Sequence, residues 1–176
     1  MVLTEAERVD FPSMRPCSWL ANSFKAFHEP SFRGMGGFRF LEHMSDAFIE
    51  AWGDSFEEAY VEAAKAFYEL VSSMKGVEPR VERVVEARGR DLQELLYDML
   101  EKLIILFDSE GFLASRIEVE ELKRGAGENY LRLRLLGEPY DPGRHRHGIH
   151  VKAVTYHLME VRSEDSRKVL RFLLDI

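Results

Sequence analysis

Residues 55–74 read SFEEAYVEAAKAFYELVSSM, and the apolar side chains in this stretch recur every three or four positions. That spacing gathers them on one face of an α-helix and leaves the charged residues on the opposite face. Ser55 and Glu58 have the S-x-x-E spacing of a capping box, which marks where such a helix begins. We therefore predict an amphipathic helix that starts at Ser55 and ends near Gly76. Its predicted apolar face comprises Phe56, Ala59, Tyr60, Ala63, Phe67, Leu70, Val71 and Met74.

Short apolar and aromatic runs flank this helix on both sides and are typical of β-strands. Residues 38–42 and 47–52 precede it, and residues 81–85 follow it. A second helix is predicted to begin at Asp91 and to stop before Gly111, because a capping residue precedes a second apolar run at helical spacing. Its predicted apolar face comprises Leu95, Leu96, Met99, Leu103, Leu106 and Phe107.

The last third of the chain alternates between apolar and polar residues. Residues 117–120 and 130–135 alternate on either side of a glycine-containing turn, which predicts an antiparallel hairpin. A polar loop at 137–148 is followed by predicted strands at 151–161 and 169–174. Two helices packed against a mostly antiparallel sheet make a two-layer sandwich of the α+β class.

The composition is that of one folded domain. Of the 176 residues, 45% are hydrophobic and 31% are charged, which is too apolar for a disordered chain. Residues 1–36 contain prolines and polar residues without a sustained apolar period, so we predict a loose N-terminal extension there and a folded domain over residues 37–176. We hypothesise that Met14 or Met35 is the true translation start, and Met35 stands just before the first predicted strand.

Charge and cysteine content limit the partners and the compartment. The formal net charge of −7 opposes strong binding to RNA or DNA, whose phosphates must be neutralised by Lys and Arg. We expect direct RNA binding to be weak or absent, with only Arg144, Arg146 and Lys152 as a small basic group. The single cysteine, Cys17, excludes a disulfide framework, and the sequence shows neither a membrane-length apolar run nor a signal peptide. These features predict a cytoplasmic protein without membrane contact.

The last predicted strand leads directly into Asp175 and Ile176. Termini usually fray in polar residues, whereas here an aspartate and a free carboxylate follow an apolar strand. Both are hard oxygen ligands, and a third acid at another strand end would complete a divalent-cation site. Asp46, between the runs at 38–42 and 47–52, is the candidate, because three crowded negative groups would favour a cation. The alternative is that the strand simply reaches the domain edge and the acids are solvated.

The histidines make a weaker case for a metal site. His145, His147 and His150 lie in a loop with Gly and Pro, but no cysteine is nearby and the intervening arginine opposes a cation. We therefore expect these imidazoles to be solvated and not to bind zinc. His43 and His157 have no evident nucleophile partner and are expected to be packed or hydrogen-bonded. The sequence contains no P-loop, G-x-S-x-G or H-E-x-x-H motif, so it does not predict an enzyme.

Four segments occur together in a characteristic order. They are His-Met-Ser-Asp at residues 43–46, Gly-Asp-Ser-Phe-Glu-Glu-Ala at 53–59, Leu-Leu-Tyr at 95–97, and Val-Lys-Ala-Val-Thr-Tyr-His at 151–157 with Asp-Ile at 175–176. In this order they resemble the archease family of tRNA-splicing ligase cofactors, over about residues 38–176. The family typically has Thr-Ala where this chain has Met44 and Ser45, which changes the contacts flanking Asp46 but not its carboxylate.

The resemblance implies both a site and a role. It implies that Asp46, Asp175 and Ile176 bind a divalent metal, calcium in the first place, with manganese and magnesium in the same ligand class. It also implies an accessory protein, not an enzyme, that activates the GTP-dependent tRNA-splicing RNA ligase by promoting ligase guanylylation and repeated turnover in tRNA exon joining. Two other functions stay open from the residues alone: a stand-alone metal-dependent phosphoester hydrolase, and a chaperone-like protein-binding module in which metal is irrelevant.

Overall fold

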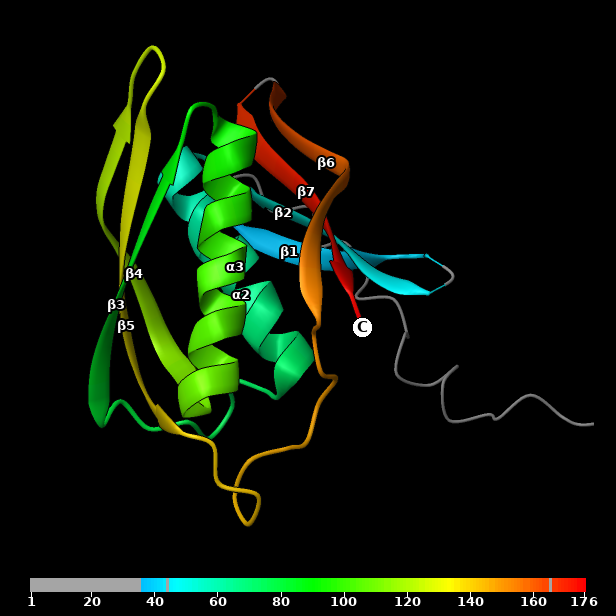
Figure 1. Cartoon of the computed structure of the whole chain (residues 1–176), viewed down its shortest axis with the longest axis vertical. Helices are drawn as coiled ribbons and strands as arrows, with labels where there is room; N and C mark the ends of the chain where they lie inside the picture. Colours follow the sequence, from blue (N-terminus) through cyan, green and yellow to red (C-terminus); the bar gives the residue numbers. More distant parts are fainter. Residues whose placement is uncertain (1–35, 44, 165) are drawn as a thin grey trace, which may run out of the picture. The chain divides into compact units, whose positions relative to one another are not determined.

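The structure, a computed structural model, describes residues 36–43, 45–164 and 166–176. Residues 1–35 of the predicted extension, with both alternative start sites, lie outside the described residues. The described part contains two helices and seven strands, which are labelled in Figure 1. The helices are α2 (Phe56–Val71) and α3 (Leu92–Glu110), and the strands are β1 (Gly37–Leu41), β2 (Asp46–Gly53), β3 (Val81–Gly89), β4 (Phe112–Arg124), β5 (Asn129–Pro139), β6 (Ala153–Glu164) and β7 (Arg167–Asp175).

The strands form two sheets. The four-stranded sheet has the order β1-β2-β7-β6, and the three-stranded sheet has the order β3-β5-β4. All pairings among the described strands are antiparallel, so the predicted α+β class is confirmed. The division into two sheets was not predicted, because side-chain alternation shows which face of a strand is buried but not which strands pair.

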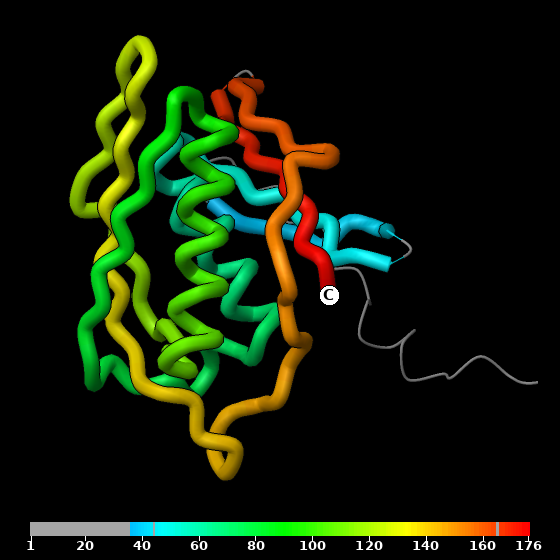
Figure 2. Tube along the Cα trace, viewed as in Figure 1, coloured from blue at the N-terminus to red at the C-terminus, as the bar shows by residue number. Residues whose placement is uncertain are grey.

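The core lies where the helices meet the two sheets. α2 contacts β2 of the four-stranded sheet and β4 of the other, while α3 contacts β3 of the three-stranded sheet and β6 of the other. Figure 2 follows the chain as it crosses from β5 to β6 through residues 140–152. Tyr60, Phe67, Leu95 and Phe172 are fully buried in this core. The predicted apolar faces of both helices are therefore the faces that pack.

α2 begins at the predicted N-cap residue, Ser55. The Ser55 hydroxyl accepts a hydrogen bond from the Glu58 N–H (3.1 Å), which satisfies one backbone donor left open in the first turn. The Glu58 carboxylate accepts hydrogen bonds from the N–H groups of Asp54 (2.7 Å) and Gly36 (2.9 Å). The same side chain therefore ties the residue before β1 to the helix. α2 ends at Val71, earlier than predicted.

Replacing the capping hydroxyl tests this assignment. Ser55→Ala removes the acceptor for the Glu58 N–H and is expected to lower the free energy of unfolding by about 1 kcal/mol. Urea denaturation measures the change, with Ser163→Ala on the exposed part of β6 as the matched control. Equal losses in both variants would show that the hydroxyl has no capping role.

α3 also begins and ends as predicted. Asp91 caps it by accepting a hydrogen bond from the Glu94 N–H (2.8 Å). Gly111 ends it with a φ of 63°, a left-handed conformation that a residue with a Cβ adopts at a cost. Among the described residues, neither helix combines the length and the apolar character needed to cross a membrane.

β6 is less regular than the strand predicted over residues 151–161. Its pairing with β7 is interrupted between Thr155 and Glu160, and Leu158 in this interval has a φ of 56°. Such an interruption is a β-bulge, which bends a strand and re-aims its side chains. Tyr156 stacks on Tyr97 of α3 with ring centroids 4.4 Å apart. The regular start of β6, before the bulge, lies next to the end of β7.

Candidate metal site

The structure places Asp46 and Asp175 opposite each other. Asp46 is the first residue of β2, and Asp175 is the last residue of β7. The two strands pair antiparallel with these residues in register. Directly opposed residues project their side chains from the same face of a sheet, with Cβ atoms about 5 Å apart. Two carboxylates that are distant in the sequence are therefore neighbours.

Ile176 follows Asp175 and is held by Lys152. The Lys152 backbone N–H donates to the Asp175 carbonyl (2.8 Å), and its ammonium donates to the main-chain oxygen of Ile176 (2.7 Å). The same ammonium lies 4.0 Å from Asp175 Oδ1. Lys152 therefore brings a positive charge to this acidic tail. The sequence analysis named Lys152 only as part of a small basic group, although it lies in the segment at 151–157 that carried the family resemblance.

Asp46 has polar neighbours of its own. The Ser45 hydroxyl donates to Asp46 Oδ2 (3.1 Å), and His43 Nδ1 lies 3.4 Å from the same oxygen. His43 also packs edge-on against Phe48, so the expectation that it is packed is confirmed. The Asp46 side chain is 22% exposed and that of Asp175 is 52% exposed. Both carboxylates are therefore accessible to a cation from solvent.

The donor atoms of this site suit a hard divalent cation. Carboxylate oxygens are the ligands that calcium, magnesium and manganese prefer. Within residues 36–43, 45–164 and 166–176, no group of three or more His, Cys, Asp and Glu side chains is placed to hold a metal. The third predicted ligand of a metal between Asp46 and Asp175 is not a side chain but the terminal carboxylate of Ile176.

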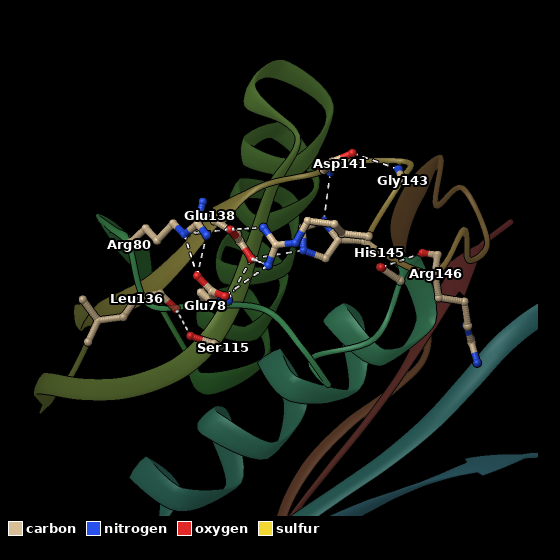
Figure 3. Close-up of polar contacts among 11 residues, drawn as sticks. Glu78, Arg80, Ser115, Leu136, Glu138, Asp141, Gly143, His145 and Arg146 are labelled. Carbon is tan, nitrogen blue, oxygen red and sulfur yellow. Dashed lines mark hydrogen bonds and ion pairs between the residues drawn. The ribbon is translucent and has the colours of Figure 1, made fainter.

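Figure 3 shows the contacts of His145, the first of the three loop histidines. His145 is buried, with 1% of its side chain exposed, so the expectation that it is solvated was wrong. Its Nδ1 accepts a hydrogen bond from the Asp141 N–H (2.9 Å), and its Nε2 lies 3.1 Å from Glu138 Oε1. Because Nδ1 is the acceptor, Nε2 carries the proton and donates it to Glu138. His147 and His150 are exposed, as expected.

Glu138 is the centre of this cluster. Its carboxylate also accepts hydrogen bonds from the Glu78 N–H (2.9 Å) and from the two terminal nitrogens of Arg144 (3.0 and 3.1 Å). The Glu78 N–H, followed by Arg144, holds the pKa of the Glu138 carboxyl at about 2. The cluster fastens the start of the crossing segment at residues 140–152 to the end of β5. Sequence reasoning missed Glu138, because a buried glutamate has no local signature.

The small basic group predicted from the sequence is largely neutralised. Arg144 forms an ion pair with Glu138, and Lys152 lies beside Asp175 and Ile176.

Comparisons with known proteins agree with one another. The profile of the archease protein family (MTH1598/TM1083) matches residues 38–176. Protein archease of Methanopyrus kandleri is 45% identical over 136 residues, which are 77% of this chain and 96% of that protein. Protein archease of Pyrobaculum calidifontis is 37% identical over 147 residues, which are 83% of this chain and 99% of that protein.

Solved structures show the same fold. The solution structure of Methanobacterium thermoautotrophicum protein 1598 has a TM-score of 0.70 and 35% sequence identity, over 80% of this chain and 99% of that chain. The crystal structure of a Thermotoga maritima archease, described as a possible chaperone, has a TM-score of 0.51 over 85% of this chain and all of that chain. At 20% identity, the second likeness supports the fold alone.

Proposed function

The chain belongs to the archease family, and from this premise we propose that it is an accessory protein that activates the GTP-dependent tRNA-splicing RNA ligase in the cytoplasm. It promotes formation of the covalent ligase-guanylate intermediate and allows repeated turnover in tRNA exon ligation. The ligase carries out the bond-forming steps, and this chain supplies groups to the ligase from its acidic site. The partner is therefore a protein, with weak or no direct contact to RNA.

The observation that carries this proposal is the pairing of Asp46 with Asp175 at the end of β7. Together with the Ile176 carboxylate, these two side chains form an anionic oxygen donor set for calcium, manganese or magnesium. Both side chains are accessible at the sheet end, so a second protein can approach them. A bound divalent cation would supply positive charge that polarises a phosphoryl oxygen.

The neighbouring residues hold these ligands in place. Ser45 and His43 both contact Oδ2 of Asp46 and limit the rotation of its carboxylate. Lys152 binds the Ile176 main-chain oxygen and orients the tail. Its ammonium also offsets part of the repulsion between the acids, so that the site stays formed before a cation binds.

A ligase assay tests the proposed function. Purified ligase is incubated with labelled GTP and a divalent metal, with and without this protein, and the covalent guanylate and the joined exons are quantified. The expected result is faster guanylylation and several turnovers per ligase only when the protein is present. Phosphoester hydrolysis by the protein alone would instead indicate a hydrolase. Metal-independent suppression of ligase aggregation, without faster guanylylation, would indicate a chaperone-like module.

A C-terminal extension probes the main-chain ligand. Adding a short Gly-Ser tag after Ile176 converts the proposed carboxylate ligand into a neutral peptide carbonyl, so calcium affinity is expected to fall roughly tenfold. Isothermal titration calorimetry measures the affinity, and the same tag placed before Met1 is the control. Unchanged affinity in the C-terminally tagged protein would remove Ile176 from the ligand set.

A further inference from the structure

β3 is an edge strand whose free side is partly covered by α3. It stands first in the order β3-β5-β4, so only one of its sides pairs with another strand. On the other side, the Arg88 N–H donates to Asp98 (2.7 Å), and the Glu86 carbonyl accepts from Lys102 (2.7 Å). In an antiparallel pair the backbone groups of successive residues point alternately toward and away from the partner strand. The even-numbered residues of β3, including Val84, therefore direct their N–H and C=O groups to the free side.

Val84 is the open position on this edge. The Arg83 guanidinium donates to the Glu82 carbonyl (2.9 Å), and Lys102 covers the carbonyl of Glu86. Among the outward residues of β3 in the described structure, only Val84 has neither its N–H nor its C=O bonded to another described group. Proteins usually blunt exposed strand edges with charged side chains, as this chain does on both sides of Val84.

A surface groove lies beside the open position. It has a volume of about 560 Å³ and lies between β3 and the C-terminal half of α3. Its apolar lining comprises Val84, Val85, Ile105 and Leu106, and its polar lining comprises Glu86, Lys102, Ser109, Glu110 and Arg132. Val84 is 40% exposed and Ile105 is 57% exposed. The groove therefore offers apolar contact next to an unbonded peptide group, the two elements by which a sheet edge binds an extended peptide.

In the four-stranded sheet, charged side chains on neighbouring strands form ion pairs with one another. One row of neighbouring side chains crosses it with alternating sign, so that its formal charges cancel. In order from β1 to β6, this row is Arg39, Glu50, Arg171 and Glu160.

The three-stranded sheet carries two comparable rows that end in a glutamate on β3. Each has an arginine of β5 between a glutamate of β3 and a glutamate of β4. The row through Arg132 has a formal charge of −1, whereas in the row through Arg134 the β4 glutamate, Glu118, also pairs with Arg116 (2.7 Å). Both rows reach the free edge of β3 with a glutamate, on the two sides of Val84. The rows are Glu86, Arg132 and Glu120, and Glu82, Arg134 and Glu118.

We propose that the β3 edge at Val84 binds an extended segment of a partner protein as an added antiparallel strand. One apolar residue of that segment exchanges both backbone hydrogen bonds with Val84. A Lys or Arg two positions away on each side faces Glu82 and Glu86 and adds a cation at the β3 end of each row. A second copy of β3 fits less well, because it would oppose Glu82 with another glutamate. This surface is separate from the acidic site and does not depend on the proposed function.

A peptide-binding experiment with the full chain tests this proposal. The probe is a fluorescein-labelled peptide, GKVIVKG, and its charge-reversed counterpart is GEVIVEG. In fluorescence anisotropy, GKVIVKG is expected to bind about tenfold more tightly, because its lysines meet the glutamates of β3. Hydrogen exchange at the Val84 N–H, measured by NMR, is expected to be fast in the free protein and slow in the complex.

Variants locate the binding site. Val84→Pro removes an N–H that faces away from β5, a position where an edge strand tolerates proline, and is expected to weaken GKVIVKG binding about tenfold. Ile105→Gln removes apolar contact from the other wall and gives an independent test if the proline variant does not fold. Ile149→Gln, at a residue that is 40% exposed and absent from the groove lining, is the matched control and should leave binding unchanged.

Several outcomes would overturn the proposal. Equal affinity for the two peptides, no binding up to about 1 mM, or binding unaffected by both Val84→Pro and Ile105→Gln would each exclude it. Slow exchange of the Val84 N–H that appears only at high protein concentration would assign the edge to a second copy. Slow exchange at every concentration would show that a segment of the same chain already covers it.

Discussion

Asp46→Asn is expected to abolish activation of the ligase, lowering the stimulated rate of guanylylation by about 100-fold. The amide keeps the size of the side chain but removes the negative charge that faces Asp175 across the β2 and β7 pair. A divalent cation then loses one of its anionic ligands, and the ligand set retains only Asp175 and Ile176. Single-turnover guanylylation with purified ligase measures the rate, and calorimetry with calcium, manganese and magnesium measures cation binding.

The control for this variant is an accessible carboxylate away from the site. Asp108→Asn changes an acid of α3 whose side chain is 45% exposed, beside His150, and it should leave guanylylation unchanged. Full stimulation by both variants would exclude the acidic site from ligase activation. Loss of cation binding with full stimulation would retain the ligase role and reject the metal.

Glu138→Gln is expected to cause the largest loss of stability, lowering Tm by about 10 °C. The Glu138 side chain is 3% exposed and accepts hydrogen bonds from Glu78, Arg144 and His145. An amide in its place points donor hydrogens at some of these donors and leaves the Arg144 guanidinium without its buried counter-charge. Differential scanning calorimetry at neutral pH measures the change. Glu128→Gln, at an exposed ion pair with Arg88, should stay within about 2 °C of the parent protein.

We also expect the stability difference between the parent protein and Glu138→Gln to depend on pH. The folded protein lowers the pKa of Glu138 from its ordinary value of 4.5 to about 2. A lowered pKa stabilises the fold above the ordinary value, and this contribution is lost as the pH falls from about 4.5 to about 2. The Tm difference between the parent protein and Glu138→Gln should therefore shrink over that interval. A difference that stays constant down to pH 2 would show that the charge of Glu138 does not stabilise the fold.

The regular elements could be predicted because their signals are local. Ser55 accepts the Glu58 N–H, and Asp91 accepts the Glu94 N–H, within the same turn of chain that the spacing identified. Gly111 ends α3 through its own backbone conformation. The bulge in β6 had no such signal, because Leu158 adopts a positive φ that its residue type does not favour. Tertiary contacts near the bulge, including the packing of Tyr156 on Tyr97, stabilise this conformation, and they are not visible in the local sequence.

The sequence identified the acidic residues of the candidate site but not the residues that contact them. Asp46 and Asp175 stood out because acids at strand ends are chemically conspicuous. Lys152 looked like an ordinary surface residue until its ammonium was placed on the Ile176 oxygen. His145 and His147 have nearly the same neighbours in sequence, yet one is buried against Glu138 and the other is exposed. Such contacts depend on which distant segment packs against a residue in the folded protein. The local sequence around that residue does not identify this segment.

The sequence by itself determined the α+β class, the two helices with their caps, the strand positions and the acids that we propose as cation ligands. These properties arise from side-chain periodicity and from hydrogen bonds that span about four residues. Only the tertiary structure decided that the strands divide into two sheets, that Asp46 faces Asp175, and that Val84 lies open at an edge. Strand pairing and burial depend on how the surfaces of strands and helices pack against one another. The free energy of this packing comes from contacts between segments that are distant in sequence, so no local stretch of sequence determines it.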